Sequence, residues 1–218
     1  MHSSSVANFL ERNTSFILTA HETPDGDAVG SECAVFEALR QLGKNVIILN
    51  ADEMARKYEF IDPENHIQQL NSLDLVPNDI GDWALLILDT NDIHNIGQIE
   101  TLILPYVREY FIIDHHESGE DIVSGNLVEN NASSTCEILF ELFTLLGIQL
   151  TYPIALALFV GIVYDTGSFI YPKTTVKTFE AAQRLVQCGV NPNYVYSKIY
   201  ESNSISSLKL QSRVLSTL

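Results

Sequence analysis

Aspartate and histidine residues follow three short apolar runs of the sequence, and side chains of these types bind divalent cations. His21, Asp25 and Asp27 follow the first run, Asp89 comes directly after a later one, and the triplet Asp114-His115-His116 follows another. Carboxylates brought close together repel one another unless protons or cations neutralise them. A ligand set of imidazoles and carboxylates without thiolates suits Mn²⁺, Mg²⁺, Zn²⁺ or Fe²⁺.

The number of carboxylates indicates two ions that share a ligand. Two ions about 3.5–4 Å apart can activate a water and stabilise the leaving oxygen of a phosphoryl displacement. Pro24 and Gly26 suit a tight turn that aims His21, Asp25 and Asp27 inward together. Metal-assisted hydrolysis of a phosphate ester is the reaction class that this set of residues predicts.

Each group also has a simpler interpretation. The run Pro24-Asp25-Gly26-Asp27 alone is more often a turn than a ligand loop. The run Asp89-Thr90-Asn91-Asp92 could cap a following helix. Adjacent histidines on a surface usually have no special role. All three groups follow predicted buried strands, however, and a metal site explains this shared position better than three unrelated local roles do.

The elements that must position these residues alternate between strand and helix. Apolar runs predict strands buried on both faces at 16–19, 46–49, 84–88 and 110–113. Helical stretches are predicted at 28–42, 132–146, 154–164 and 175–188, three of them followed by glycine. We therefore expect an α/β fold: a doubly wound, mostly parallel sheet of about five strands with helices on both faces. The carboxyl ends of such strands share one edge, where ligands bind.

Two further local features bear on this fold. Ser134 supplies an N-cap hydroxyl and Glu137 follows three residues later, as a capping box requires. Cys33, Cys136 and Cys188 are odd in number and form no CxxC pair, so neither a disulfide framework nor a thiolate metal site is expected. Buried thiols in a reducing compartment are the simplest interpretation.

Charge and hydropathy limit the functional classes. The chain has 28 acidic and 12 basic residues, a formal net charge of −16, which argues against binding long nucleic acid duplexes. Small phosphorylated substrates stay compatible, because bound cations invert the local field. The start lacks the features of a signal peptide, and the longest apolar run, Ile154 to Val163, is about half the ~20 residues of a spanning helix. We expect a soluble, cytoplasmic protein without membrane contact.

Taken together, four motifs resemble those of the DHH phosphoesterase family. They are His21-x-x-x-Asp25-x-Asp27-Ala-Val-Gly-Ser31, the lone Asp89, Asp114-His115-His116, and Gly161-Ile162-Val163-Tyr164-Asp165-Thr166-Gly167-Ser168-Phe169. The resemblance extends from about Thr14 to Val190. The forms of the first and last motifs, together with Ala132-Ser133-Ser134-Thr135-Cys136-Glu137, are similar to the bacterial branch of nano-RNases and pAp phosphatases.

This resemblance implies two Mn²⁺ ions, with Mg²⁺ or Co²⁺ as alternatives. The ligands it implies are His21, Asp25 and Asp89 for one ion, and Asp27, Asp89, His115 and Asp165 for the other. Asp89 would then bridge the ions. Asp114 would orient a histidine, and His116 would face the scissile phosphate as a transition-state contact or a leaving-group acid. Only the resemblance marks Asp165, since it follows a predicted buried helix.

The implied activity is manganese-dependent hydrolysis of phosphoester bonds in short oligoribonucleotides or nucleotide phosphomonoesters such as pAp. A cyclic dinucleotide phosphodiesterase and an inorganic pyrophosphatase, with the same metal chemistry, are the alternatives within enzymes. A metal-binding regulatory module without activity is the alternative from another class. Relatives often carry a basic residue near Asn95, and whether His94 takes its place is left open.

Residues 1–190 are interpreted as the DHH catalytic domain, and 191–218 as a helical connector to an absent second domain. Family members normally continue into a domain with a glycine-rich, His-containing motif, which these 218 residues do not contain. We therefore expect this chain to bind metal but to turn over substrate slowly. An amphipathic terminal helix packed on the same domain is an equal alternative for the last stretch. Its apolar residues could also serve a homodimer.

Overall fold

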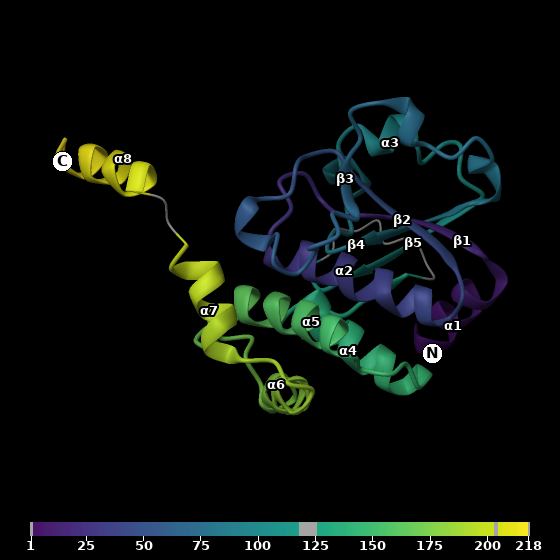
Figure 1. Cartoon of the computed structure of the whole chain (residues 1–218). Coiled ribbons are helices and arrows are strands. Elements are labelled where there is room, and N and C mark those ends of the chain that lie inside the picture. Colours follow the sequence, from purple (N-terminus) through teal and green to yellow (C-terminus); the bar gives the residue numbers. More distant parts are fainter. Residues whose placement is uncertain (1, 118–125, 203–204, 218) are drawn as a thin grey trace.

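The computed structural model (Figure 1) describes residues 2–117, 126–202 and 205–217, and within them the chain forms a six-stranded parallel sheet. The spatial order of the strands is β3-β2-β1-β4-β5-β6. Their bounds are β1 Ser15–Thr19, β2 Asn45–Asn50, β3 Ile67–Gln69, β4 Ala84–Leu88, β5 Glu109–Asp114 and β6 Leu127–Val128. This confirms the predicted doubly wound α/β fold, with every strand pair parallel.

The four predicted strands are present, and side chains from both of their faces are buried. In β1, Phe16 and Leu18 belong to one apolar core, whereas Ile17 belongs to a second core on the other face of the sheet. The edge strands β3 and β6 were not predicted. They are three and two residues long, too short for an alternating or apolar pattern to identify them.

Helices cover the two faces unequally. The larger core lies between the sheet and the helices α1 (His2–Arg12), α2 (Gly26–Gln41), α4 (Thr135–Leu146) and α5 (Tyr152–Asp165). On the other face lie α3 (Ile99–Leu102) and the 3₁₀ segment η4 (Ile93–Ile96), which contribute Ile96 and Ile99 to the second core. Figure 1 shows this layering, with α3 on one side of the strands and α2, α4 and α5 on the other.

Two glycines allow α2 and α5 to cross closely. A Cβ on Gly30 would lie 2.5 Å from the carbonyl oxygen of Ala157, and one on Gly161 would lie 2.5 Å from Oδ1 of Asp27 in α2. The approach brings the first turn of α2 beside the last turns of α5. Gly26 has the same role, because its Cβ would lie 2.7 Å from the side chain of Tyr164. Gly26 was expected in a tight turn; it is instead the first residue of α2 and packs against that ring.

The helix expected at 132–146 begins three residues later, at Thr135, because Ser134 is its N-cap and accepts a hydrogen bond from the backbone N–H of Glu137. The expected capping box is incomplete. The carboxylate of Glu137 instead accepts hydrogen bonds from the hydroxyls of Ser133 and Thr178, which ties α4 to α6. Both halves of a capping box are present in α6, between Thr175 and Thr178.

The last helices are α6 (Val176–Gln187), α7 (Pro192–Tyr200) and α8 (Ile205–Leu215). Helix α7 packs on α5 and on the 3₁₀ segment η1 (Arg56–Tyr58), and it buries Val195 and Ile199. Helix α8 lies apart from the other elements in Figure 1, with Leu210 and Val214 exposed. The division into a domain at 1–190 and a connector at 191–218 stays a prediction. Within the described residues, every helix is too short or too polar to cross a bilayer.

Candidate metal centre

The predicted ligands gather where the strand order of the sheet reverses. Strands β1 and β4 are neighbours, and the chain winds outward from them in opposite directions, through β2 on one side and β5 on the other. In open α/β sheets ligands bind outside the carboxyl ends of the strands at this point. His21 follows β1, Asp89 follows β4, and Asp114 ends β5. The sheet topology therefore delivers these three groups to one edge.

Asp89 lies at the centre of the group. Its Oδ2 is 3.6 Å from Nε2 of His21, and its Oδ1 is 3.6 Å from Nε2 of His115 and 3.9 Å from Nδ1 of His116. The side chain is almost fully buried, and the backbone has φ 63°, a left-handed conformation that non-glycine residues rarely adopt. Such strained residues occur preferentially at functional sites, where the surrounding structure enforces the conformation.

His115 faces three carboxylates with one ring nitrogen. Its Nε2 lies 2.9 Å from Oδ2 of Asp165 and 3.8 Å from Oδ2 of Asp27, besides its approach to Asp89. Although the ring is buried, neither nitrogen makes a hydrogen bond of normal geometry within the described part of the chain. Buried polar atoms normally have a hydrogen-bond partner. A buried imidazole nitrogen that has none and faces carboxylates is the arrangement expected of a metal ligand.

The amino-terminal ends of α2 and α4 hold the two carboxylates of the first motif. Asp25 caps α2, and its Oδ1 accepts from the backbone N–H groups of Asp27 and Ala28. Asp27 is fully buried and accepts from the backbone N–H groups of Thr135 (2.6 Å) and Cys136 (3.0 Å) at the start of α4. Unpaired N–H groups and the helix dipole favour negative charge at both positions.

The remaining charge is not neutralised by the protein. Burial, together with the nearby charges of Asp89 and Asp165, raises the pKa of Asp27 well above its ordinary range. Burial also raises the pKa of Asp89 to about 7, against the opposing hydrogen bond from His21. Burial alone would lower the pKa of His21, but the hydrogen bonds to Asp89 and to the carbonyl of Glu22 raise it to about 9. Carboxylates in this condition favour a bound cation.

Hydrogen bonds hold the Nδ1 side of His116, and the opposite edge of its ring is exposed. Its Nδ1 donates to Oδ1 of Asp114 at 2.8 Å, and Asn91 donates to the other oxygen of Asp114 and to the backbone carbonyl of His116. The hydrogen bond to Asp114 raises the pKa of His116. About half of the His116 side chain is exposed (54%), so its Nε2 edge is accessible to a ligand.

The arrangement fits divalent cations. Potential ligand atoms form three sets, and within each set the atoms lie no more than 4.8 Å apart. The sets are His21 with Asp25 and Asp89, Asp27 with His115 and Asp165, and Asp89 with His115 and His116. The first two sets correspond to the two ions expected from the sequence, with Asp89 next to both. His21 directs Nδ1 to the carbonyl of Glu22 at 2.7 Å, which leaves Nε2 on the side of the carboxylates.

The structure places all eight predicted site residues close together, and it shows supporting residues that the sequence did not predict. Thr135 donates its hydroxyl to Asp89 at 2.9 Å, and Asn91 holds both Asp114 and His116. The only signal for Thr135 was its place at the start of a predicted helix. His94 is turned away: it is exposed, and its Nδ1 lies 2.9 Å from Glu100. The described structure thus gives no support to His94 as a phosphate contact.

Comparison with protein families and known structures is consistent with this geometry. The DHH family, N-terminal domain, matches residues 15–162, more than half of the chain. A bifunctional oligoribonuclease and PAP phosphatase from Bacillus subtilis is 32% identical over 191 residues, covering 85% of this chain and 57% of that protein. A cyclic-di-AMP phosphodiesterase, also from B. subtilis, is 26% identical, covering 92% of this chain and 32% of that protein.

Among solved structures, an exopolyphosphatase-related protein from Bacteroides fragilis superposes with a TM-score of 0.88 at 23% sequence identity. The match covers 99% of this chain and 64% of that one, and it shows a shared fold. In each of these comparisons the chain spans less than two thirds of the matched protein.

Proposed function

The chain belongs to the DHH family, and on that premise we propose that it is a two-metal phosphoesterase acting on short oligoribonucleotides or nucleotide phosphomonoesters such as pAp. The observation that carries this proposal is the position of Asp89, within reach of both ligand sets. His21, Asp25 and Asp89 would hold one ion, and Asp27, Asp89, His115 and Asp165 the other. Mn²⁺ suits these donors, and Mg²⁺ or Co²⁺ are alternatives.

Bound divalent cations supply a nucleophilic water at neutral pH and neutralise charge that develops on the phosphate. The protein's own residues orient the carboxylate ligands and donate a proton to the leaving oxygen. The backbone N–H groups of Thr135 and Cys136 fix Asp27, and the Thr135 hydroxyl fixes Asp89. Both carboxylates are thereby held in one orientation before any ligand arrives.

His116 is the proposed donor of the proton to the leaving oxygen. Asp114 accepts from Nδ1 and so keeps the protonated imidazole stable, while the exposed edge of the ring carries Nε2. Burial alone would raise the pKa of Asp114, but the hydrogen bonds from His116 and the nearby charges of His116 and His115 together lower it. It therefore remains an acceptor while His116 loses and regains a proton.

Substrate choice rests on the relatives and on charge. The names of the B. subtilis relatives include oligoribonuclease, PAP phosphatase and cyclic-di-AMP phosphodiesterase, which favours nucleotides with one or few phosphodiester bonds. The net charge of −16 disfavours long duplexes as partners. The identity to the cyclic-di-AMP phosphodiesterase supports cleavage of cyclic dinucleotides as the second candidate.

A panel of four compounds tests the proposal: pAp, a diribonucleotide, cyclic di-AMP and pyrophosphate, each incubated with the chain and saturating Mn²⁺. We expect release of phosphate from pAp or of mononucleotides from the dinucleotide, at a low rate. Cleavage of cyclic di-AMP alone would support the second candidate. No product from any of the four, with ions bound, would favour the metal-binding module without activity.

A further inference from the structure

Lys57 is a cation near the carboxylate group that the proposed chemistry does not use. It lies in η1, the segment that follows β2, and its ammonium is 4.7 Å from the ring centroid of Tyr58 and 5.2 Å from that of Tyr164. Tyr58 is fully buried, and the two rings meet edge to face with centroids 6.3 Å apart. The lysine is therefore held on a rigid aromatic support rather than extended into solvent.

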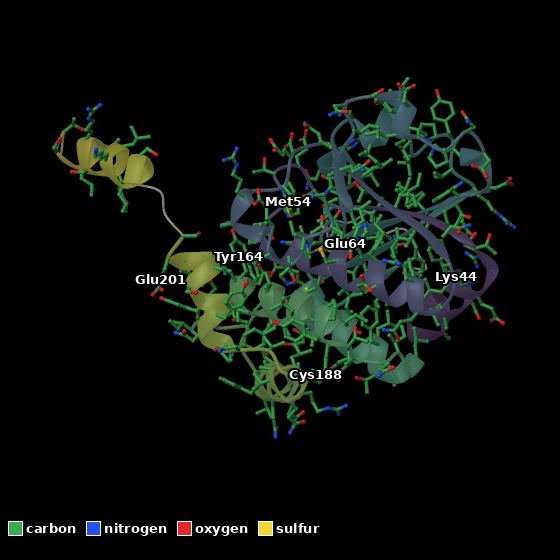
Figure 2. All side chains as sticks on the ribbon, in the orientation of Figure 1. Lys44, Met54, Glu64, Tyr164, Cys188 and Glu201 are labelled. Atoms are coloured by element: carbon green, nitrogen blue, oxygen red, sulfur yellow. The ribbon has the colours of Figure 1, made fainter. Side chains whose placement is uncertain are left out.

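This support is part of the same frame as the predicted ligands. Tyr164 directly precedes Asp165 at the end of α5, and its ring packs against Gly26, which lies between Asp25 and Asp27. Tyr164 is labelled in Figure 2, beside helix α7. Helix α7 contacts both α5, which carries Tyr164, and η1, which carries Lys57. Lys57 is therefore separated from the first turn of α2 by a single aromatic ring.

The charge of Lys57 has no direct partner in the described structure. Burial lowers its pKa and the nearby charge of Asp25 raises it, yet the ammonium forms no hydrogen bond or ion pair with any described residue. By contrast, Lys173 already directs its ammonium to the backbone carbonyl of His115. A half-buried ammonium with free donors recognises an anion, most strongly a phosphate.

Topology separates Lys57 from His116. The strand order places β2, β1, β4 and β5 side by side, so η1 after β2 and His116 after β5 flank the carboxylates from opposite sides. Lys57 and His116 therefore approach the carboxylates from the two sides of the group. A nucleotide with two phosphate groups offers one anion to each side.

We propose that Lys57, supported by Tyr58 and Tyr164, binds a second, non-reacting phosphate of the substrate. The inference rests on the proposed function and narrows it to nucleotides that carry two phosphate groups, such as adenosine 3′,5′-bisphosphate. Lys57 thereby offers a positive charge to a ligand with two phosphate groups, beside carboxylates that are otherwise negative.

The experiment compares two ligands that differ by a single phosphate, adenosine 3′,5′-bisphosphate and adenosine 3′-monophosphate. Their affinities are measured by calorimetry with Mn²⁺ present, on chains that all carry His116→Ala so that neither ligand is consumed. Lys57→Met removes the charge, and Lys57→Arg keeps it. Lys198→Met is the matched control, because Lys198 lies 5.5 Å over the ring of Tyr194 in α7.

We expect Lys57→Met to weaken the bisphosphate about tenfold or more and to weaken the monophosphate much less. Lys57→Arg should retain most of the difference in affinity between the two ligands, and Lys198→Met should retain all of it. Equal effects of Lys57→Met on the two ligands, no effect, or no binding of the bisphosphate to the parent chain would overturn the inference. Hydrolysis by the chain with His116 intact is assayed separately and decides the proposed function alone.

Discussion

Thr135 joins the two most buried carboxylates of the site. Its backbone N–H donates to Asp27 and its hydroxyl donates to Asp89. Valine has nearly the same shape and keeps the backbone contact, so Thr135→Val removes the hydroxyl bond to Asp89 alone. Supporting contacts of this kind usually change metal affinity by 10–100-fold.

We expect Thr135→Val to weaken Mn²⁺ binding by about 10–100-fold, measured by calorimetric titration. Thr144→Val, in the same helix, is the control, because the Thr144 hydroxyl bonds only to the carbonyl of Phe140 within α4. Equal Mn²⁺ affinity in the two variants would show that Asp89 needs no such support.

Glu32 is a buried carboxyl outside the ligand sets, and it makes stability depend on pH. Burial raises its pKa from the ordinary 4.5 to about 8, despite a hydrogen bond from Asn50. Above pH 4.5 the unfolded chain loses this proton while the folded chain keeps it. The unfolded state then binds fewer protons, so the free energy of unfolding falls as pH rises toward 8.

Glu32→Gln should remove this part of the pH dependence. Denaturant unfolding at a series of pH values between about 5 and 8, with chelator present, measures it. The parent chain should lose more stability across this range than the Gln variant does. Glu37→Gln, on the same helix but less buried, serves as control and should follow the parent chain. Parallel curves for parent and Glu32→Gln would refute the assignment.

At the residue scale, the place of the proposed ligands at one edge of the sheet was predictable, whereas the residues that support them were not. His21, Asp89 and Asp114 come directly after strands whose apolar runs are evident, so their shared edge follows from parallel topology. Thr135 and Asn91 act only because α4 and the segment after β4 approach the ligands in three dimensions. Asp165 lies at the end of a helix, and no periodicity distinguishes it from a surface residue.

At the element scale, the crossing of α2 and α5 sets the position of Asp27. A Cβ on Gly161 would lie 2.3 Å from Sγ of Cys136 and 2.5 Å from Oδ1 of Asp27. Gly161→Ala must therefore move α4, α5 or the carboxylate. Overpacking of a core costs about 1–3 kcal/mol, and here the displaced atom is also a predicted ligand.

We expect Gly161→Ala to lower both the free energy of unfolding, by about 1–3 kcal/mol, and the affinity for Mn²⁺. Gly81→Ala is the matched control, since its added Cβ would approach no atom closer than 3.9 Å. Denaturant unfolding and Mn²⁺ titration of the same preparations measure the two effects. If Gly161→Ala were destabilised but bound Mn²⁺ with normal affinity, the crossing of α2 and α5 would not determine the position of Asp27 in the site.

The sequence predicted the existence and type of the major elements better than their ends. The four apolar strands and the helices of the larger core were identified, because burial on both faces leaves long apolar runs. The short strands β3 and β6 and helix α1 were missed. Helix α4 starts at Thr135 rather than Ala132, since the Ser134 side chain competes for the N–H of Glu137.

At the scale of the whole molecule, this chain carries the proposed ligands but spans only 57% of its oligoribonuclease relative. Leu208, Leu210, Val214 and Leu215 of α8 are exposed, and the expected roles of 191–218 as connector or dimer contact stay predictions. The proposed contact of Lys57 with a second phosphate gives the site itself a testable share in substrate choice.

The central claim is a pair of ions that share Asp89. Elemental analysis of the chain after equilibration with Mn²⁺ and removal of free metal tests it most directly. We predict two ions per chain, loss of both in Asp89→Ala, and retention of both in Asp74→Ala, a control at an exposed carboxylate. Two ions retained by Asp89→Ala, or a single ion in the parent chain, would contradict the shared site.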